Sequence, residues 1–263
     1  NIEGKVGIVR PTFEEYPNRL KPEQIVTYQA QCPEFSYSAD DLMTYFADKD
    51  IQSLLLINPD NPTGNYIPYA DCLRLADWCQ QRNVLFVLDE SFIDFSVEHP
   101  TFFKDAILEQ YSNLVVIKSI SKSYGVPSLR LGILATSNVD IMTVIRRSVS
   151  IWNINSFAEF FLQILGKYEA SYQQAMDEFR AERARFVDEL HKIGFLRVLP
   201  SEANYLLCEV KQPHTPRELA IRLLKDYDIL IKDCTSKCNA PYIRIAVRDT
   251  VDNNRLIDAL IDL

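Results

Sequence analysis

The stretch Ser119-Ile120-Ser121-Lys122-Ser123-Tyr124-Gly125 decides how this sequence is expected to fold. It directly follows the short apolar run Leu114–Ile117, and such a run, bounded by turn-forming residues, is typical of a buried strand in a parallel sheet. Lys122 therefore comes just after the carboxyl end of a predicted strand. Ligands of open parallel sheets bind at that edge, so we expect the lysine amine to belong to a binding site.

Two further polar residues occupy similar positions in the sequence. Asn61 follows the apolar run Leu54–Ile57, and Asp89 comes at the end of the run Val84–Leu88. We expect these runs to be strands of the same sheet, with crossover helices between them. An amide, a carboxylate and an amine are thereby predicted to meet at one sheet edge.

These groups fit the chemistry of pyridoxal 5′-phosphate (PLP). A lysine amine forms a Schiff base with the PLP aldehyde, and a carboxylate keeps the pyridine nitrogen protonated so that the ring accepts electrons. An amide can donate a hydrogen bond to the 3-oxygen of the ring. Ser119, Ser121 and Arg130 lie close to the lysine in the sequence, and hydroxyls together with a guanidinium can hold a dianionic phosphate.

Each motif also has an ordinary structural explanation when it is taken alone. Asn-Pro-Thr-Gly is a common turn composition, Ser-x-Ser-Lys is common at helix starts, and an aspartate at a strand end often caps a helix. Here the motifs occur in order, and each follows an apolar run. This joint occurrence favours a cofactor site over three unrelated turns.

The segments Asn58–Gly64, Leu88–Phe92 and Ser119–Gly132 resemble the signature of the fold-type I PLP enzymes, the aspartate aminotransferase superfamily. The resemblance implies an α/β large domain with a mostly parallel sheet that binds PLP, followed by a smaller C-terminal α+β domain. We expect the large domain to span residues 1–166 and the small domain residues 167–263.

The resemblance also implies roles for individual residues. Lys122 would be the Schiff-base lysine and Asp89 the partner of the pyridine nitrogen, which makes these two the catalytic residues. Asn61 would contact the 3-oxygen, and Phe13 would stack on the ring. Ser119, Ser121 and Arg130 would hold the PLP phosphate. The full set of residues for which contacts to PLP are implied is Phe13, Asn61, Asp89, Ser119, Ser121, Lys122 and Arg130.

Finer motifs are similar to the L-threonine-O-3-phosphate decarboxylases of cobalamin biosynthesis, a family closely related to the histidinol-phosphate aminotransferases. The similar segments are Arg10–Tyr16, Asp89–Phe95, Tyr124–Gly132, Ala203–Leu207, Ile229–Cys234 and Tyr242–Arg248. Phe92 stands where the aminotransferases usually have a tyrosine, and the run containing Pro127 is more like that of the decarboxylases. We therefore expect a lyase that converts O-phospho-L-threonine, or a close phospho-amino acid, into an aminoalkyl phosphate.

Substrate contacts are implied for Asn61, Lys232 and Arg244. Arg244 corresponds to the ligand of the substrate carboxylate, and Lys232 stands where the decarboxylases carry a substrate-binding arginine. The alternative is an aminotransferase that moves the amino group of a phosphorylated amine, such as histidinol phosphate, to 2-oxoglutarate. A non-catalytic protein of the same fold is a third possibility, and the intact set of Lys122, Asp89 and Asn61 argues against it.

Composition limits the possible partners. A net charge of −8 argues against nucleic acid, and no apolar stretch is long enough to span a membrane. The six cysteines and three histidines show no paired ligand spacing, so we expect no metal site and free thiols in the cytoplasm.

In the resembled family, a longer segment precedes a strand like Val6–Val9. That segment carries a glycine-rich turn that binds the cofactor phosphate, and it reaches into the neighbouring subunit's site. We expect a homodimer, and we expect this sequence to lack the segment.

Overall fold

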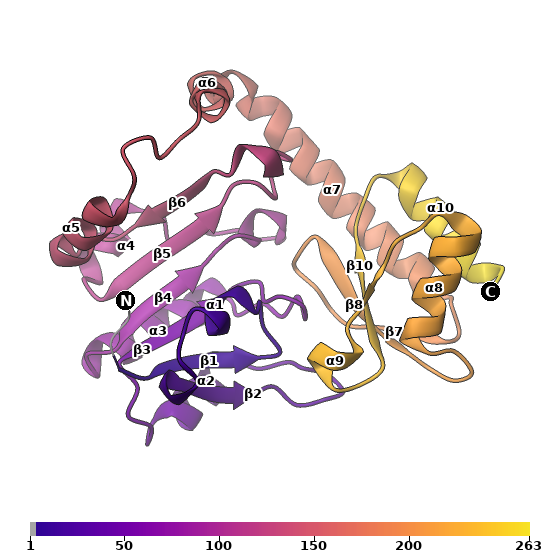
Figure 1. Cartoon of the computed structure of the whole chain (residues 1–263), viewed down its shortest axis with the longest axis horizontal. Helices are drawn as coiled ribbons and strands as arrows, with labels where there is room; N and C mark the ends of the chain where they lie inside the picture. The colour runs from indigo at the N-terminus through magenta and orange to yellow at the C-terminus, as the bar shows by residue number, and fades with distance from the viewer. Residues whose placement is uncertain (1–3) are drawn as a thin grey trace.

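The computed structural model of the protein describes residues 4–263 and contains two sheets of different size (Figure 1). The six-stranded sheet has the order β2-β1-β3-β4-β5-β6, and the four-stranded sheet has the order β7-β8-β10-β9. The predicted α/β architecture, with a mostly parallel large sheet, is confirmed.

The large sheet is parallel from β2 to β5, and β6 runs antiparallel to β5 at one edge. Its strands are β1 (Val6–Arg10), β2 (Ile25–Gln29), β3 (Ser53–Ile57), β4 (Leu85–Asp89), β5 (Leu114–Ser119) and β6 (Gly132–Ala135). The sequence did not predict β2, because its side chains are only partly buried at the other sheet edge, which weakens the apolar signal of a strand.

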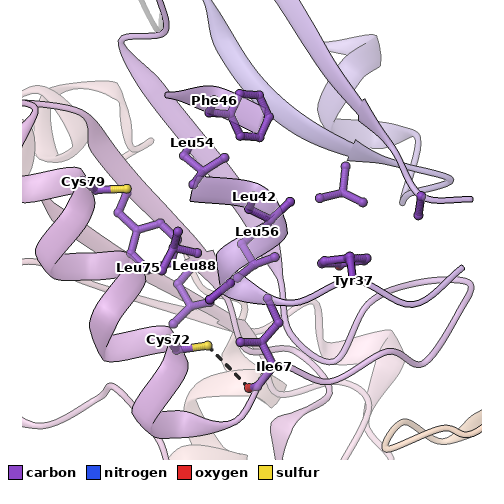
Figure 2. Close-up of a cluster of buried hydrophobic side chains, with 14 of the residues drawn as sticks. Tyr37, Leu42, Phe46, Leu54, Leu56, Ile67, Cys72, Leu75, Cys79 and Leu88 are labelled. Carbon is purple, nitrogen blue, oxygen red and sulfur yellow. Dashed lines mark hydrogen bonds between the residues drawn. The ribbon is translucent and has the colours of Figure 1, made fainter. Parts of the chain in front are cut away.

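Strand β3 is apolar along its whole length because both faces of the sheet are covered. Leu54 and Leu56 pack with Leu42 and Leu75 on the face covered by α2 (Ala39–Phe46) and α3 (Tyr69–Gln81), as Figure 2 shows. The alternate residues of β3 pack on the opposite face, where α7 (Glu169–Leu190) lies. This double cover fixes the carboxyl ends of the strands, where the polar motif residues follow.

The remaining helices of this part complete the cover of the sheet or connect its strands. They are α1 (Glu15–Asn18), α4 (Asp105–Gln110), α5 (Val139–Ser148) and α6 (Ser156–Leu165), with short 3₁₀ turns at Pro22–Gln24, Ile93–Phe95, Pro127–Leu129 and Gly166–Tyr168. Ser38 caps α2, since its hydroxyl accepts a hydrogen bond from the Asp41 amide. None of the helices in residues 4–263 combines the length and apolar character needed to cross a membrane.

The small sheet is antiparallel and lies beside the C-terminal half of α7 in Figure 1. Its strands are β7 (Leu196–Val198), β8 (Tyr205–Val210), β9 (Lys232–Asp233) and β10 (Tyr242–Ala246), and its helices are α8 (Pro216–Tyr227), α9 (Thr235–Cys238) and α10 (Thr250–Ile261). Strand β9 is short, because within the apolar segment that begins at Ile229 only Lys232 and Asp233 pair with β10.

The two sheets share part of one buried apolar cluster. Leu207 of β8, Tyr242 of β10 and the cysteines that flank α9 pack in the same cluster as Phe35 and Tyr37 from the large sheet's side of the molecule. A second cluster, with Leu206 and Ile243, belongs to the small sheet alone. The small sheet is therefore attached to the large one by packing as well as by α7.

Candidate active site

A cavity of about 650 Å³ opens at the carboxyl ends of β3, β4 and β5. Most of the residues that the sequence marked as site residues line it together. They are Phe13, Asn61, Asp89, Ser119, Ser121, Lys122 and Arg130. Segments that are far apart in the sequence thus meet at the predicted sheet edge.

Asp89 is held rigidly at the end of β4. The Ser91 amide donates a 2.8 Å hydrogen bond to its Oδ1 and the Tyr16 hydroxyl a 2.5 Å hydrogen bond to its Oδ2. Burial raises the pKa of Asp89, and the hydrogen bonds from Ser91 and Tyr16 oppose this increase. Within residues 4–263 no cationic side chain pairs with this carboxylate, so a positively charged ligand group in the cavity would stabilise its ionised form.

Tyr16 is a site residue that the sequence analysis missed. It lies on α1, lines the cavity, and packs edge-on against Phe13 with 6.0 Å between the ring centroids. Burial, together with the adjacent Asp89 carboxylate, raises its pKa, so its hydroxyl stays a hydrogen-bond donor at neutral pH. The only available signal was its place at the end of the motif segment Arg10–Tyr16.

Lys122 lies in the turn after β5 with its amine unpaired. Its carbonyl accepts a 3.2 Å hydrogen bond from the amide of Gly125, whose φ of +64° is one that glycine adopts easily. In the part of the chain that the structure describes, the Lys122 amine makes no hydrogen bond and no ion pair. The amine is therefore free to react with a ligand in the cavity.

A second lysine, Lys118, lines the same cavity and is engaged. Its Nζ lies 2.5 Å from Oδ1 of Asp94, and both side chains are largely buried. The contrast separates the two amines, because Lys118 is already paired with a carboxylate whereas Lys122 has no partner within residues 4–263.

The three groups predicted to hold a phosphate all line the cavity. Ser121 is buried, and the Ser119 amide donates a 2.9 Å hydrogen bond to the Ser91 hydroxyl, which ties the end of β5 to the loop after β4. Arg130 has a left-handed backbone conformation with a φ of +58°, and its guanidinium donates a 3.2 Å hydrogen bond to the Pro127 carbonyl. The remaining donors of its fork are available for a ligand.

Arg244, on β10 of the small sheet, does not line the cavity but contacts a residue that does. Its Nη1 donates a 2.7 Å hydrogen bond to Oδ1 of Asn61, and its guanidinium lies 5.0 Å from the ring centroid of Tyr205. Tyr205 also packs edge-on against Phe92, at 5.2 Å between centroids. Arg244 is thereby held in front of Asn61, one of the residues that line the cavity.

Lys232 does not line the cavity. It lies opposite Arg244 in the β9–β10 ladder, which directs both side chains to the same face of the small sheet, and it is exposed. Its charge is near that of Arg244 but outside the buried part of the site.

No arrangement of His, Cys, Asp or Glu suited to a metal ion occurs among the residues from Gly4 onward. All six cysteines are free thiols, and only Cys32 is exposed.

Comparisons with known proteins agree with this geometry. The sequence model of the family "Aminotransferase class I and II" matches residues 2–260. The threonine-phosphate decarboxylase of Salmonella typhimurium is 33% identical over 257 residues, which cover 96% of this chain and 69% of that enzyme. A CMP-5′-(3-aminopropyl)phosphonate synthase of Streptomyces rubellomurinus is 31% identical over 265 residues, which cover 100% of this chain. The chain spans only 42% of that synthase.

A solved structure resembles the whole described fold. The histidinol-phosphate aminotransferase of Clostridium acetobutylicum superposes with a TM-score of 0.87 at 28% identity, and the match covers 98% of this chain and 77% of that one.

Proposed function

Because the chain belongs to the class I and II aminotransferase family, we propose that it is part of a PLP-dependent lyase that removes CO₂ from O-phospho-L-threonine or a close phospho-amino acid. The observation that carries the proposal is one cavity that combines a lysine and a buried carboxylate, neither of which has a charged partner within residues 4–263. Arg244 is hydrogen-bonded to Asn61 in the lining of that cavity. A decarboxylase of phosphothreonine and a phosphonate synthase among the relatives favour a substrate with a phosphorus oxyanion.

PLP is the cofactor of this family, and the cavity residues fit it. When bound, PLP supplies an aldehyde for covalent attachment and a protonated ring that accepts electrons from the substrate. Asp89 would supply the negative charge that stabilises the protonated ring nitrogen. The positive ring would in turn stabilise the buried Asp89 carboxylate, whose pKa is raised by burial. Lys122 would attach the cofactor, Asn61 would contact the 3-oxygen, and Phe13 would lie on the ring.

The phosphate of PLP would be held by Ser119, Ser121 and Arg130. A guanidinium fork and hydroxyl donors match the geometry and charge of phosphate oxygens.

Arg244 would bind the substrate carboxylate, because its planar fork can make two parallel hydrogen bonds to it. By holding the carboxylate in one orientation, Arg244 would determine which bond of the substrate the cofactor chemistry acts on. Arg244 would hold the carboxylate end of the substrate. A second cation at the phosphate end would then prevent the substrate from rotating about the bonds of its Cα. Lys232 is one candidate for that second cation. Once released from the cofactor and protonated, the Lys122 ammonium would donate a proton to the substrate Cα in place of the lost CO₂.

Aminotransfer is the second candidate function, because the histidinol-phosphate aminotransferase of Clostridium acetobutylicum has a closely similar fold. Both reactions require Arg244. Phe92 favours decarboxylation, since it packs against Tyr205 and offers no hydroxyl to the cofactor 3-oxygen.

Product analysis of the PLP-loaded protein tests the proposal. We expect CO₂ and an aminoalkyl phosphate from O-phospho-L-threonine without 2-oxoglutarate. Formation of glutamate from 2-oxoglutarate and histidinol phosphate, with no CO₂, would replace the lyase by the aminotransferase.

We also propose that the protein is a homodimer. Its interface would be formed by α5, α6 and the loop between them. Large apolar side chains are exposed there, with Trp152 at 92% and Ile151 at 96% exposure, which is more than an isolated surface usually presents. Light scattering should give twice the chain mass, and Trp152→Ser should shift the equilibrium to monomer. A monomeric wild type would contradict the dimer.

We further propose a location in the cytoplasm, because the free thiols fit a reducing compartment.

A further inference from the structure

Asn155, the residue that caps helix α6, makes hydrogen bonds in two directions. Its Oδ1 accepts a 3.0 Å hydrogen bond from the Ala158 amide, which caps the helix. Its Nδ2 donates a 3.1 Å hydrogen bond to the Leu129 carbonyl. The start of α6 is thereby tied to the 3₁₀ turn Pro127–Leu129, which directly precedes Arg130.

The backbone of Arg130 depends on support from its surroundings. Its φ of +58° and ψ of +40° lie in the left-handed region, which residues other than glycine adopt at a cost. Such a conformation persists only where the surrounding structure holds it. The Leu129 carbonyl belongs to the same planar peptide unit as the Arg130 amide, so the hydrogen bond from Asn155 fixes the plane from which the Arg130 backbone turns.

Apolar packing holds the residue on the other side of Arg130. Leu131 is 7% exposed and packs in one cluster with Ile120 and with Ala158 of α6, which is fully buried. Helix α6 therefore contacts the residue before Arg130 and shares a cluster with the residue after it.

The guanidinium of Arg130 is held by the same turn. Arg130 lines the cavity, and its Nη1 donates a 3.2 Å hydrogen bond to the Pro127 carbonyl. Both the backbone and the side chain of Arg130 are thus fixed relative to the turn Pro127–Leu129. A shift of this turn would move the guanidinium within the cavity.

We propose that Asn155 is a positioning residue that acts through Arg130 and raises the affinity of the site for the phosphate group of its cofactor. The inference rests on the proposed function for the identity of the cofactor, PLP, and for the contact between Arg130 and its phosphate. Asn155 does not line the cavity. It would therefore contribute by holding Arg130 and not by touching the phosphate.

Asn138 provides a matched control, because it caps α5 in the same way. Its Oδ1 accepts a 3.0 Å hydrogen bond from the Ile141 amide, and its Nδ2 donates a 3.2 Å hydrogen bond to the Ser112 carbonyl. Neither Asn138 nor Ser112 lines the cavity. The two asparagines share a helix cap and a hydrogen bond to a distant carbonyl, and they differ in the segment that this bond holds.

The test compares Asn155→Ser with Asn138→Ser, and Asn155→Asp with Asn138→Asp. Serine and aspartate cap a helix about as well as asparagine, and both lack the amide group that donates to the distant carbonyl. The whole chain is titrated with PLP and, in parallel, with pyridoxal, which has no phosphate. Binding is followed by the absorbance of the bound ligand.

Asn155→Ser should weaken PLP binding by about threefold to tenfold, the loss of one hydrogen bond, and pyridoxal binding by less than about twofold. Asn155→Asp should show the same selective loss. Asn138→Ser and Asn138→Asp should bind both ligands as the wild type does. The inference is overturned if the variants of Asn155 match those of Asn138, or if they lose PLP and pyridoxal equally.

A double variant shows whether Asn155 acts through Arg130. Arg130→Gln alone should weaken PLP binding by about tenfold or more. Adding Asn155→Ser should cause little further loss, because two changes that remove the same contact are not additive. Fully additive losses would mean that Asn155 acts elsewhere, and they would overturn the inference.

Failure of the proposed function would look different. If Arg130→Gln binds PLP as the wild type does, Arg130 is removed from the phosphate site, and the role of Asn155 falls with it. If the wild type binds PLP but releases no CO₂ from O-phospho-L-threonine, the proposed reaction is wrong. The selective loss of PLP binding in Asn155→Ser would still support the positioning role in that case.

Discussion

At the scale of single residues, Lys122 and Lys118 provide a contrast within one cavity. Lys122→Ala should abolish covalent attachment of PLP, because the remaining lysine of the cavity is paired with Asp94. The visible absorbance band of covalently bound PLP should disappear, and borohydride reduction should label no other peptide. A reduced adduct on Lys118 would show that the wrong amine had been assigned.

Asp89→Asn should damage catalysis far more than folding. The carboxylate stabilises the positive charge of the cofactor ring, and we expect its loss to lower kcat by about a hundredfold or more. The folded state loses only charge-assisted hydrogen bonds from Ser91 and Tyr16, and it no longer has to bury an ionisable group. Near-normal turnover of the variant with PLP bound would rule out this role for Asp89.

Tyr16→Phe is the matched variant, because it removes one hydrogen bond to Asp89 and leaves the carboxylate in place. It should lower kcat by about tenfold, the effect of losing one hydrogen bond to a charged group. The pH profile of kcat should also move to higher pH, because the hydrogen bond from Tyr16 lowers the pKa of Asp89.

At the scale of elements, the loops after β3 and β4 each bury an acid. Burial raises the pKa of Asp60 and of Glu90 to about 7, against about 4 in an unfolded chain. Between these values the folded state binds more protons than the unfolded state, so stability falls as pH rises from about 4 to 7. Each acid contributes a slope of at most about 1.4 kcal/mol per pH unit.

Urea unfolding between pH 5 and 8 checks this pH dependence. Asp60→Asn and Glu90→Gln should each flatten the decline of the free energy of unfolding with pH, whereas Asp226→Asn, which changes an exposed acid of α8, should leave it unchanged. A wild-type stability that rises over this range would contradict the assignment.

Sequence patterns predicted the elements whose signal is local. The strands β3, β4 and β5 are continuous apolar runs because they are buried on both faces, and the motif residues follow each run directly, so the site at the sheet edge could be predicted. Contacts between distant segments carry no such signal. The hydrogen bond from Tyr16 to Asp89 joins residues 73 positions apart, and the one from Arg244 to Asn61 joins residues 183 apart. The edge strand β2 was missed for a different reason, because its partly buried side chains weaken the apolar signal of a strand.

At the scale of the whole molecule, two adjacent residues of β8 pack in different hydrophobic clusters. Leu207 packs in the cluster shared by both sheets, and Leu206 packs in the cluster of the small sheet. Each substitution to alanine should cost about 2–5 kcal/mol of stability. Hydrogen exchange should show that Leu207→Ala lowers the protection of amides in β3 as well as β8, while Leu206→Ala affects the small sheet first. Unchanged β3 protection in Leu207→Ala would mean that the sheets unfold independently.

The shared cluster also restricts how the two sheets can move against each other. A wide hinge opening would expose Leu207, Tyr242 and the cysteines beside α9 to water, and close-packed interiors tolerate small sliding displacements better than separation. We therefore expect the small sheet to slide against the large one by small steps, which would shift Arg244 relative to Asn61 without separating the two sheets.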